Sequence, residues 1–310
     1  MQMIKGINKK INKYSFINGE EIIETDNGKF FVKKKNDDTK ELYNYLSSRK
    51  FNNYLKLEED NKDVEIYSYK DDNVKTSDKA IDLVYLLSML HIKTTTYREV
   101  NLDEVKRIYE NVNDEINALN IYYHKLQDEI ETKVYMSPAE YLLIRNISII
   151  YKMLVLSKES IDKWYSIKIK QNRERVVLVH NNVSINNFID TDKLIFKNWD
   201  KALKDYVVYD FYSFYKNDYK NLEFNSLFDL YQRKYKYSED EMLLFNSLIN
   251  KVWIVNMDSS NYDNTVKVND LITYIKKTNK FLLKNNHEEQ KTNKNEFYKE
   301  NDNIQSSSNK

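Results

Sequence analysis

The first part of the chain alternates between short β-prone runs and polar breaks. An Asp-Asn-Gly signal at residues 26–28 separates two of these runs, and it predicts a β-hairpin turn. A helical pattern lies between the second run and the third. The strand patterns cover residues 19–25, 29–35 and 63–70, and the helical pattern covers residues 38–51. Together they predict a small antiparallel-sheet lobe over residues 1–75.

From Ser77 onward the hydrophobic pattern is helical. Residues 77–94 (SDKAIDLVYLLSMLHIKT) are apolar on nearly every face, which indicates a helix buried in a larger core. In the next helical stretch, apolar residues recur at alternating spacings of three and four, as in a heptad seam. The seam positions are Leu102, Val105, Tyr109, Val112, Ile116, Leu119, Tyr123, Leu126 and Ile130.

A second long helix begins cleanly after the next turn. Ser137 is a good N-cap, Pro138 suits the first helical position, and Glu140 completes a capping box. Helices over residues 102–131 and 138–168 are therefore predicted to form an antiparallel hairpin. Two interpretations of the heptad seam stay open: packing within the chain, or a coiled coil with a partner.

The sequence pattern of the remaining residues predicts a strand, a polar loop and further helices. Residues 175–189 (RVVLVHNNVSINNFI) have the pattern of a buried strand followed by a sharp polar loop. Helical patterns cover residues 224–236 and 239–255. We therefore predict a helical lobe over residues 76–284. The polar, aperiodic segment 285–310 is predicted to be a disordered tail.

Composition and charge narrow the class of protein. The chain of 310 residues has 49 basic and 48 acidic residues and no cysteine. Neither a nucleic-acid surface nor a disulfide or thiolate metal site is expected. The most apolar long stretch, YLLIRNISIIYKMLVL, is interrupted by Arg145 and Lys152, so no membrane span is expected. The N-terminus lacks the apolar core of a signal peptide. We expect a soluble, cytoplasmic protein.

The polar loop carries the candidate chemistry. The stretch LVHNNVSINNFI is followed by LIFKNWDKA and then by YDFYSF. This order, after a strand-rich lobe and a helical lobe, resembles the aminoglycoside phosphotransferase and choline kinase-like superfamily. Within it, the chain is most similar to CotS-type spore-coat kinase-like proteins. The resemblance covers roughly residues 12–280 and implies an α+β, two-lobed protein-kinase-like fold.

In that superfamily the catalytic loop usually reads His-Gly-Asp, four residues and Asn, and the metal-binding strand reads Ile-Asp-Trp or Ile-Asp-Phe. By this resemblance His180 is the loop histidine and Asn187 the loop asparagine. Asn182 stands where the catalytic aspartate belongs. Asn198, just before Trp199, stands where the metal-binding aspartate belongs.

The same resemblance implies roles for four further residues. Lys33 in FFVKKK corresponds to the nucleotide lysine, and Glu41 to its helix partner. Asp210 in YDFYSF matches a later aspartate with a mainly structural role. His91 matches a common Leu-His pair and is expected to be a core histidine. His180 is expected to brace the loop by hydrogen bonding.

The departures from the family pattern indicate impaired chemistry. Asn182 has a neutral amide that cannot accept a proton at neutral pH, and losing such a group costs roughly 10²–10⁴ in rate. Asn198 offers Mg²⁺ one neutral oxygen, although this cation prefers anionic ones. Asp200 lies two residues on, so it is the candidate replacement ligand, together with Asn187.

The leading hypothesis is a pseudokinase that binds a small molecule or a protein partner, with ATP and Mg²⁺ held weakly if at all. One alternative is an active ATP-dependent phosphotransferase on a small-molecule hydroxyl, with Asp200 holding the metal. Another is a spore-coat-like assembly protein that self-associates through the 102–168 hairpin. The spore association rests on the resemblance alone, and the sequence identifies no substrate.

Overall fold

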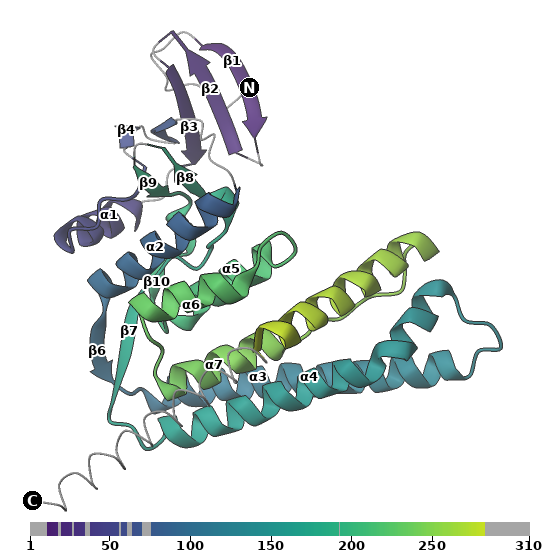
Figure 1. The fold of residues 1–310 in the computed structure, drawn as a ribbon. Coiled ribbons are helices and arrows are strands. Elements are labelled where there is room, and N and C mark those ends of the chain that lie inside the picture. Colours follow the sequence, from purple (N-terminus) through teal and green to yellow (C-terminus); the bar gives the residue numbers. More distant parts are fainter. Residues whose placement is uncertain are drawn as a thin grey trace, which may run out of the picture. The chain divides into compact units, whose positions relative to one another are not determined.

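The computed structural model describes two compact units (Figure 1). The described residues are 11–17, 20–26, 28–34, 38–55, 57–60, 64–69, 76–191 and 193–282. The first unit takes its described residues from Met1–Val100, Gln171–Leu222 and Asp229–Glu241. The second takes them from Asn101–Lys170, Glu223–Phe228 and Met242–Lys310.

Some of the predicted features include residues that the structure does not describe. Asn27 of the predicted turn and the predicted tail, 285–310, lie outside the described residues. The lobe boundaries, 1–75 and 76–284, stay predictions.

A five-stranded antiparallel sheet opens the first unit, with the strand order β1-β2-β3-β5-β4. Its strands are β1 (Ile11–Ile17), β2 (Glu20–Thr25), β3 (Gly28–Lys34), β4 (Leu57–Asp60) and β5 (Val64–Tyr69). Gly28, where β3 begins, has φ 121°, a conformation that residues with a side chain rarely adopt. Strands β2 and β3 pair antiparallel, with Thr25 opposite Gly28, so the predicted hairpin is present.

The alternation of side chains along β3 and β5 divides the sheet residues between two clusters. Ile23, Phe30, Val32, Val64 and Ile66 form one buried cluster. The other contains Phe31, Leu55, Tyr67 and Ile189. Since Ile189 comes from far along the chain, this second cluster holds the polar-loop region against the sheet. Helix α1 (Asp38–Ser48) connects β3 to β4.

A second group of short strands carries the polar loop. Strands β6 (Thr96–Glu99), β7 (Arg173–Val179) and β10 (Leu203–Asp205) form an antiparallel sheet in the order β10-β7-β6. The loop after β7 leads into the hairpin of β8 (Phe188–Asp190) and β9 (Leu194–Phe196). Helices α2 (Thr76–Thr94) and α5 (Val208–Asp218) bring buried polar side chains to this loop. The next helices in the chain are α6 (Phe224–Lys234) and α7 (Glu239–Asn250).

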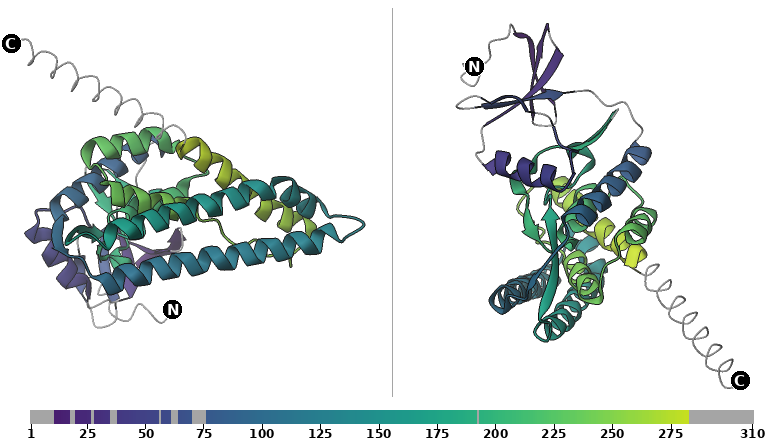
Figure 2. Two further views of the ribbon diagram at one scale, coloured as in Figure 1. Left: turned by 90° about the horizontal axis from the view of Figure 1, so that it is seen from below. Right: turned by 90° about the vertical axis from the view of Figure 1, so that its left-hand side faces the viewer.

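The second unit is built around a long helical hairpin. Helices α3 (Leu102–Glu131) and α4 (Pro138–Lys168) pack along each other and are joined by a short turn (Figure 2). A further helix covers residues 261–282. The predicted hairpin is confirmed, and so is the α+β class with an antiparallel-sheet N-terminal region and a helical C-terminal region.

Most of the predicted seam of α3 is buried within its own unit. Its buried residues are Val105, Val112, Ile116, Leu119, Tyr123 and Ile130, all of them predicted seam positions. The Tyr123 hydroxyl donates to the Trp253 carbonyl oxygen over 2.6 Å, and Ser157 of α4 donates to the Ser247 carbonyl oxygen over 2.8 Å. The seam therefore packs against neighbouring segments of this chain.

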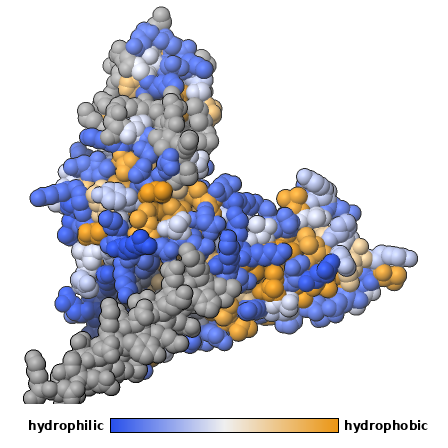
Figure 3. All heavy atoms as spheres, viewed as in Figure 1, coloured by the Kyte–Doolittle hydropathy of each residue, from blue (hydrophilic) through white to orange (hydrophobic). Residues whose placement is uncertain are grey.

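The surface of the described chain is mixed rather than uniformly polar. Figure 3 shows hydrophobic patches (orange) among hydrophilic residues on the visible face of the helices. In the turn between α3 and α4, Val134 and Tyr135 are 87% and 90% exposed. None of the described helices combines the length and the apolarity needed to cross a membrane.

The start of α4 has the geometry that its sequence predicts. Ser137 caps the helix by accepting the Glu140 backbone N–H over 3.3 Å. In return, the Glu140 carboxylate accepts the Ser137 backbone N–H over 2.7 Å. This reciprocal pair confirms the predicted capping box, which satisfies two backbone donors that a helix terminus otherwise leaves unpaired.

We expect Ser137→Ala to lower the free energy of unfolding by about 1 kcal/mol, because it removes an N-cap acceptor. Urea unfolding followed by circular dichroism would measure the loss. Ser166→Ala, an exposed change on the same helix, is the control and should leave stability nearly unchanged. Equal effects of the two changes would contradict a capping role for Ser137.

Candidate functional site

One buried carboxylate, that of Asp210, holds the polar loop after β7 by hydrogen bonds to its backbone. Asp210 of α5, 0% exposed, accepts the His180 backbone N–H over 2.8 Å and the Asn181 backbone N–H over 2.6 Å. Asn181 has φ 56°, a left-handed conformation in which asparagine is among the tolerated residues. The two hydrogen bonds therefore hold the loop at its sharpest bend.

A second layer of side chains holds this carboxylate. His91 Nε2 lies 2.9 Å from Asp210 Oδ2, and His91 Nδ1 lies 2.6 Å from the Tyr231 hydroxyl. In the neutral tautomer with the proton on Nε2, His91 donates to the carboxylate and accepts from the phenol. His91 thus links α2 to Asp210, and Tyr231 supports it from α6.

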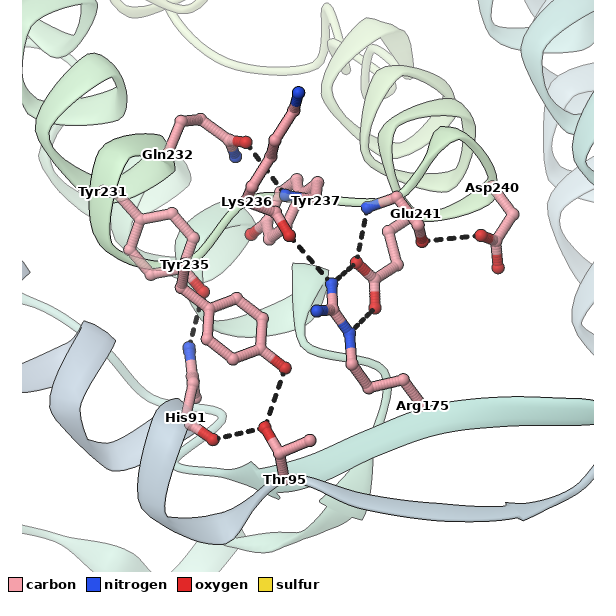
Figure 4. A network of polar contacts seen from close by, with 11 residues as sticks. His91, Thr95, Arg175, Tyr231, Gln232, Tyr235, Lys236, Tyr237, Asp240 and Glu241 are labelled. Atoms are coloured by element: carbon pink, nitrogen blue, oxygen red, sulfur yellow. Dashed lines mark hydrogen bonds and ion pairs between the residues drawn. The ribbon is translucent and has the colours of Figure 1, made fainter.

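Figure 4 shows how this network continues outward from His91. Thr95 Oγ1 donates to the His91 carbonyl oxygen over 2.7 Å and lies 3.0 Å from the Tyr235 hydroxyl. The Arg175 guanidinium lies 4.5 Å from the centre of the Tyr235 ring, and its Nε donates to Glu241 Oε1 over 2.9 Å. The network of contacts that begins at His91 therefore extends to Arg175, near the start of β7.

His180 itself is a buried, neutral group. Its Nε2 lies 2.6 Å from the Lys197 carbonyl oxygen, which fixes the proton on that nitrogen. The rings of Phe196 and Trp199 lie 5.1 and 4.7 Å away between centroids. Burial lowers the pKa of His180, against the opposing effect of the Asp210 charge. Among the described residues, its Nδ1 has no hydrogen-bond partner.

Three asparagines of the loop region form a chain of amide contacts. Asn187 Nδ2 donates to the Asn182 backbone carbonyl oxygen over 2.8 Å. Because a carbonyl oxygen only accepts, this contact fixes which end of the Asn187 amide is nitrogen. Its Oδ1 must then face Asn198, and the atom 3.0 Å away must be the Asn198 donor Nδ2. Asn198 holds this position with φ 58°.

The predicted nucleotide lysine forms an ion pair inside the same unit. Lys33 of β3 pairs with Asp200, in the single 3₁₀ turn Trp199–Lys201. The side chains are 23% and 41% exposed, so the pair contributes at most about 1 kcal/mol of stability. Glu41, the predicted partner of Lys33, is an exposed residue of α1.

A small cavity, open to solvent, lies beside this ion pair. Its lining consists of Phe31, Lys33, Thr39, Tyr43, Leu55, Tyr67, Asn198, Trp199 and Asp200. The structure thus brings Lys33, Asn198 and Asp200 of the predicted site to one place.

Glu65 is a buried acidic residue next to the cavity-lining Lys33 and Tyr67 that was not predicted from the sequence. It is the cross-strand partner of Lys33 in the β3–β5 register, and only 4% of it is exposed. The Tyr67 hydroxyl donates to its Oε2 over 2.9 Å, and burial raises the pKa of Tyr67. The available signal was the alternation in DVEIYSYK, which places Glu65 and Tyr67 on one face of a strand.

The residues as they stand do not fit a bound Mg²⁺. This cation prefers anionic oxygen ligands, but Asn187 Oδ1 already accepts a hydrogen bond from Asn198. The nearby carboxylate of Asp200 is ion-paired with Lys33. Within the described ranges, no group of three or more His, Cys, Asp or Glu side chains is placed to hold a metal ion.

Comparison of the sequence with known proteins gives no match, either to a protein-family model or to a curated protein. Solved structures do match. An aminoglycoside phosphotransferase from Alicyclobacillus acidocaldarius is 8% identical, with a TM-score of 0.64 over 90% of this chain and 92% of that one. This chain has the fold of an aminoglycoside phosphotransferase.

Two further structures extend the likeness. A spectinomycin phosphotransferase in complex with ADP and spectinomycin is 12% identical, with a TM-score of 0.55 over 87% of this chain and 93% of that one. A glucosamine kinase is 9% identical, with a TM-score of 0.50 over 88% and 74% of the two chains. The kinase-like fold predicted from the order of the lobes and the polar loop is confirmed.

The depressed pKa of His180 predicts how stability depends on pH. The unfolded histidine, with a pKa near 6.5, takes up a proton before the folded one does. The free energy of unfolding should therefore fall as the pH drops below about 6.5 toward the folded pKa, by at most about 1.4 kcal/mol per pH unit.

Urea unfolding at pH 7.5 and 5.5 would measure this slope in the wild type and in His180→Asn. The variant should lose part of the slope, whatever its absolute stability. His124→Asn, at an exposed position on α3, is the matched control. A slope unchanged by His180→Asn would contradict the neutral, buried state of this side chain.

Proposed function

We propose that this protein is a pseudokinase of the aminoglycoside phosphotransferase and choline kinase-like superfamily, which acts by binding rather than by phosphoryl transfer. The observation that carries the proposal is the amide contact between Asn198 Nδ2 and Asn187 Oδ1. In the superfamily pattern these two positions supply oxygens to the metal. Here the oxygen of one is engaged by the nitrogen of the other.

The position of the catalytic base supports the same reading. Asn182 stands there with a neutral amide, and its backbone oxygen serves to orient Asn187. Without a base, the attacking hydroxyl is left unassisted, at a cost of roughly 10²–10⁴ in rate. Loss of metal binding adds to this cost, because the metal neutralises charge that develops on the phosphates.

Other parts of the site remain suited to binding. Asp210 and His91 hold the loop, and Lys33 lines the cavity beside Asn198. Solved spectinomycin phosphotransferases of this fold contain AMP or ADP. This supports a nucleotide, or another phosphorylated small molecule, as the ligand of the cavity.

The alternative of an active phosphotransferase depends on Asp200 as the metal ligand. The ion pair with Lys33 works against it, because Asp200 would have to leave Lys33 to reach a metal. The closeness to CotS-type proteins, a cytoplasmic location and a spore-associated role stay predictions from resemblance. So does self-association through the α3–α4 hairpin, whose seam packs within its own unit.

We expect the double change Asn182→Asp, Asn198→Asp to create a response to Mg²⁺ that the wild type lacks. Thermal unfolding would be measured with ATP, with and without Mg²⁺. At 100 times its dissociation constant a ligand stabilises the folded state by about 2.7 kcal/mol. Asn186→Asp, an exposed change in the same loop, is the matched control and should create no such response. If the double variant gains none, the superfamily register of these two asparagines is wrong.

We also expect the purified wild-type chain to show no Mg²⁺-dependent ATP turnover, because both the base position and the metal position carry amides. Release of ADP from ATP in a coupled assay would test this. Turnover that requires Mg²⁺ and is abolished by Lys33→Ala would contradict the pseudokinase proposal and support the active phosphotransferase.

A further inference from the structure

Taking the cavity beside Lys33 as the ligand site proposed above, we infer that it binds the phosphate groups of its ligand directly, without a divalent cation. The ligand class is a phosphate ester in its metal-free form, such as the polyphosphate of a free nucleotide.

The charges on the cavity wall are the first argument. Of the nine described residues that line the cavity, only Lys33 and Asp200 carry a formal charge. The two form an ion pair, so the side chains that line the cavity are neutral in sum. The buried Glu65 carboxylate is not part of this lining and accepts a hydrogen bond from the lining residue Tyr67. An aspartate at position 198 would make the same wall net negative. A phosphate could then be held there only with a cation between the like charges.

The asparagine removes the need for that cation. Asn198 lines the cavity with a neutral amide in place of a carboxylate. Its nitrogen, which carries protons, points to Asn187 Oδ1, and this orientation is fixed by the Asn182 carbonyl oxygen. This hydrogen bond engages the Asn198 nitrogen, so what the amide brings to the cavity is the absence of the negative charge that would repel an oxyanion. The change from acid to amide thus turns a cation site into one compatible with an anion.

Asp200 provides the second argument, because its carboxylate already occupies the position of an oxyanion ligand. It is the acidic partner of the Lys33 ammonium, which is a typical donor to phosphate oxygens. The pair is part-exposed, with 41% of the Asp200 side chain accessible, so separating it costs little. A phosphate would compete with Asp200 for Lys33, and Asp200 acts as an internal competitor.

The two roles of Asp200 predict opposite results for one variant. If Asp200 competes with the ligand, Asp200→Asn should tighten the binding of metal-free ATP. If Asp200 instead holds a metal, the same change should weaken the binding of Mg–ATP and leave the affinity for metal-free ATP unchanged. The sign of the change in affinity separates the two.

Isothermal titration of the full-length chain with ATP in EDTA is the test. We expect binding by the wild type, roughly 10-fold or greater weakening in Lys33→Ala through loss of a charge-assisted hydrogen bond, and retained binding in Lys33→Arg. Lys34→Ala is the matched control, because it removes the same charge from the next, exposed position of β3. Added Mg²⁺ should weaken binding, since it neutralises part of the ligand's charge.

Three results would overturn the inference: no binding of ATP in EDTA, equal effects of Lys33→Ala and Lys34→Ala, or tighter binding on addition of Mg²⁺. The first, combined with a Mg²⁺ response in the double Asn-to-Asp variant, would leave the pseudokinase proposal standing. The third, combined with Mg²⁺-dependent turnover by the wild type, would overturn both. The two proposals can therefore fail separately.

Discussion

The candidate site depends on a carboxylate that no solvent reaches. Asp210 is fully buried, and a buried charge is tolerated only where hydrogen bonds replace its hydration. The backbone donors of His180 and Asn181 and the imidazole of His91 supply these bonds. The dependence is mutual, since without Asp210 two backbone N–H groups at a tight bend would be unsatisfied. This interaction sets the path of the loop, and with it the positions of the asparagines that follow.

The site therefore separates into a supporting side and a ligand-facing side with different chemistry. The supporting side contains two buried acidic residues, Asp210 and Glu241, and Glu241 is paired with the partly exposed Arg175. The proposed ligand-facing side carries amides at Asn182 and Asn198, the two positions at which the resemblance in sequence predicts carboxylates. Because an amide and a carboxylate have nearly the same shape, this difference alters charge and metal affinity while the surrounding packing can remain as it is.

Features that depend on residues close together in the sequence could be predicted, whereas contacts between distant residues could not. The hairpin of α3 and α4 and the cap at Ser137 were predictable, since they depend on residues three or four apart. The ion pair between Lys33 and Asp200 joins residues 167 positions apart, so no periodicity could indicate it. The hydrogen bond between His91 and the Tyr231 hydroxyl could not be predicted for the same reason. For the asparagine loop, resemblance supplied the candidate residues, and only the geometry showed which atom of each amide faces which neighbour.

The left-handed backbone at Asn198 has a consequence for which residues this position can hold. With φ 58°, glycine, asparagine and aspartate fit with least strain, whereas β-branched or bulky residues are outliers. If an acid is the ancestral residue here, as our proposal implies, glycine and asparagine are its low-strain replacements. Glycine would lose the contact with Asn187, whereas asparagine keeps both the backbone turn and the side-chain link. The backbone thus narrows the substitutions through which this position can lose its negative charge.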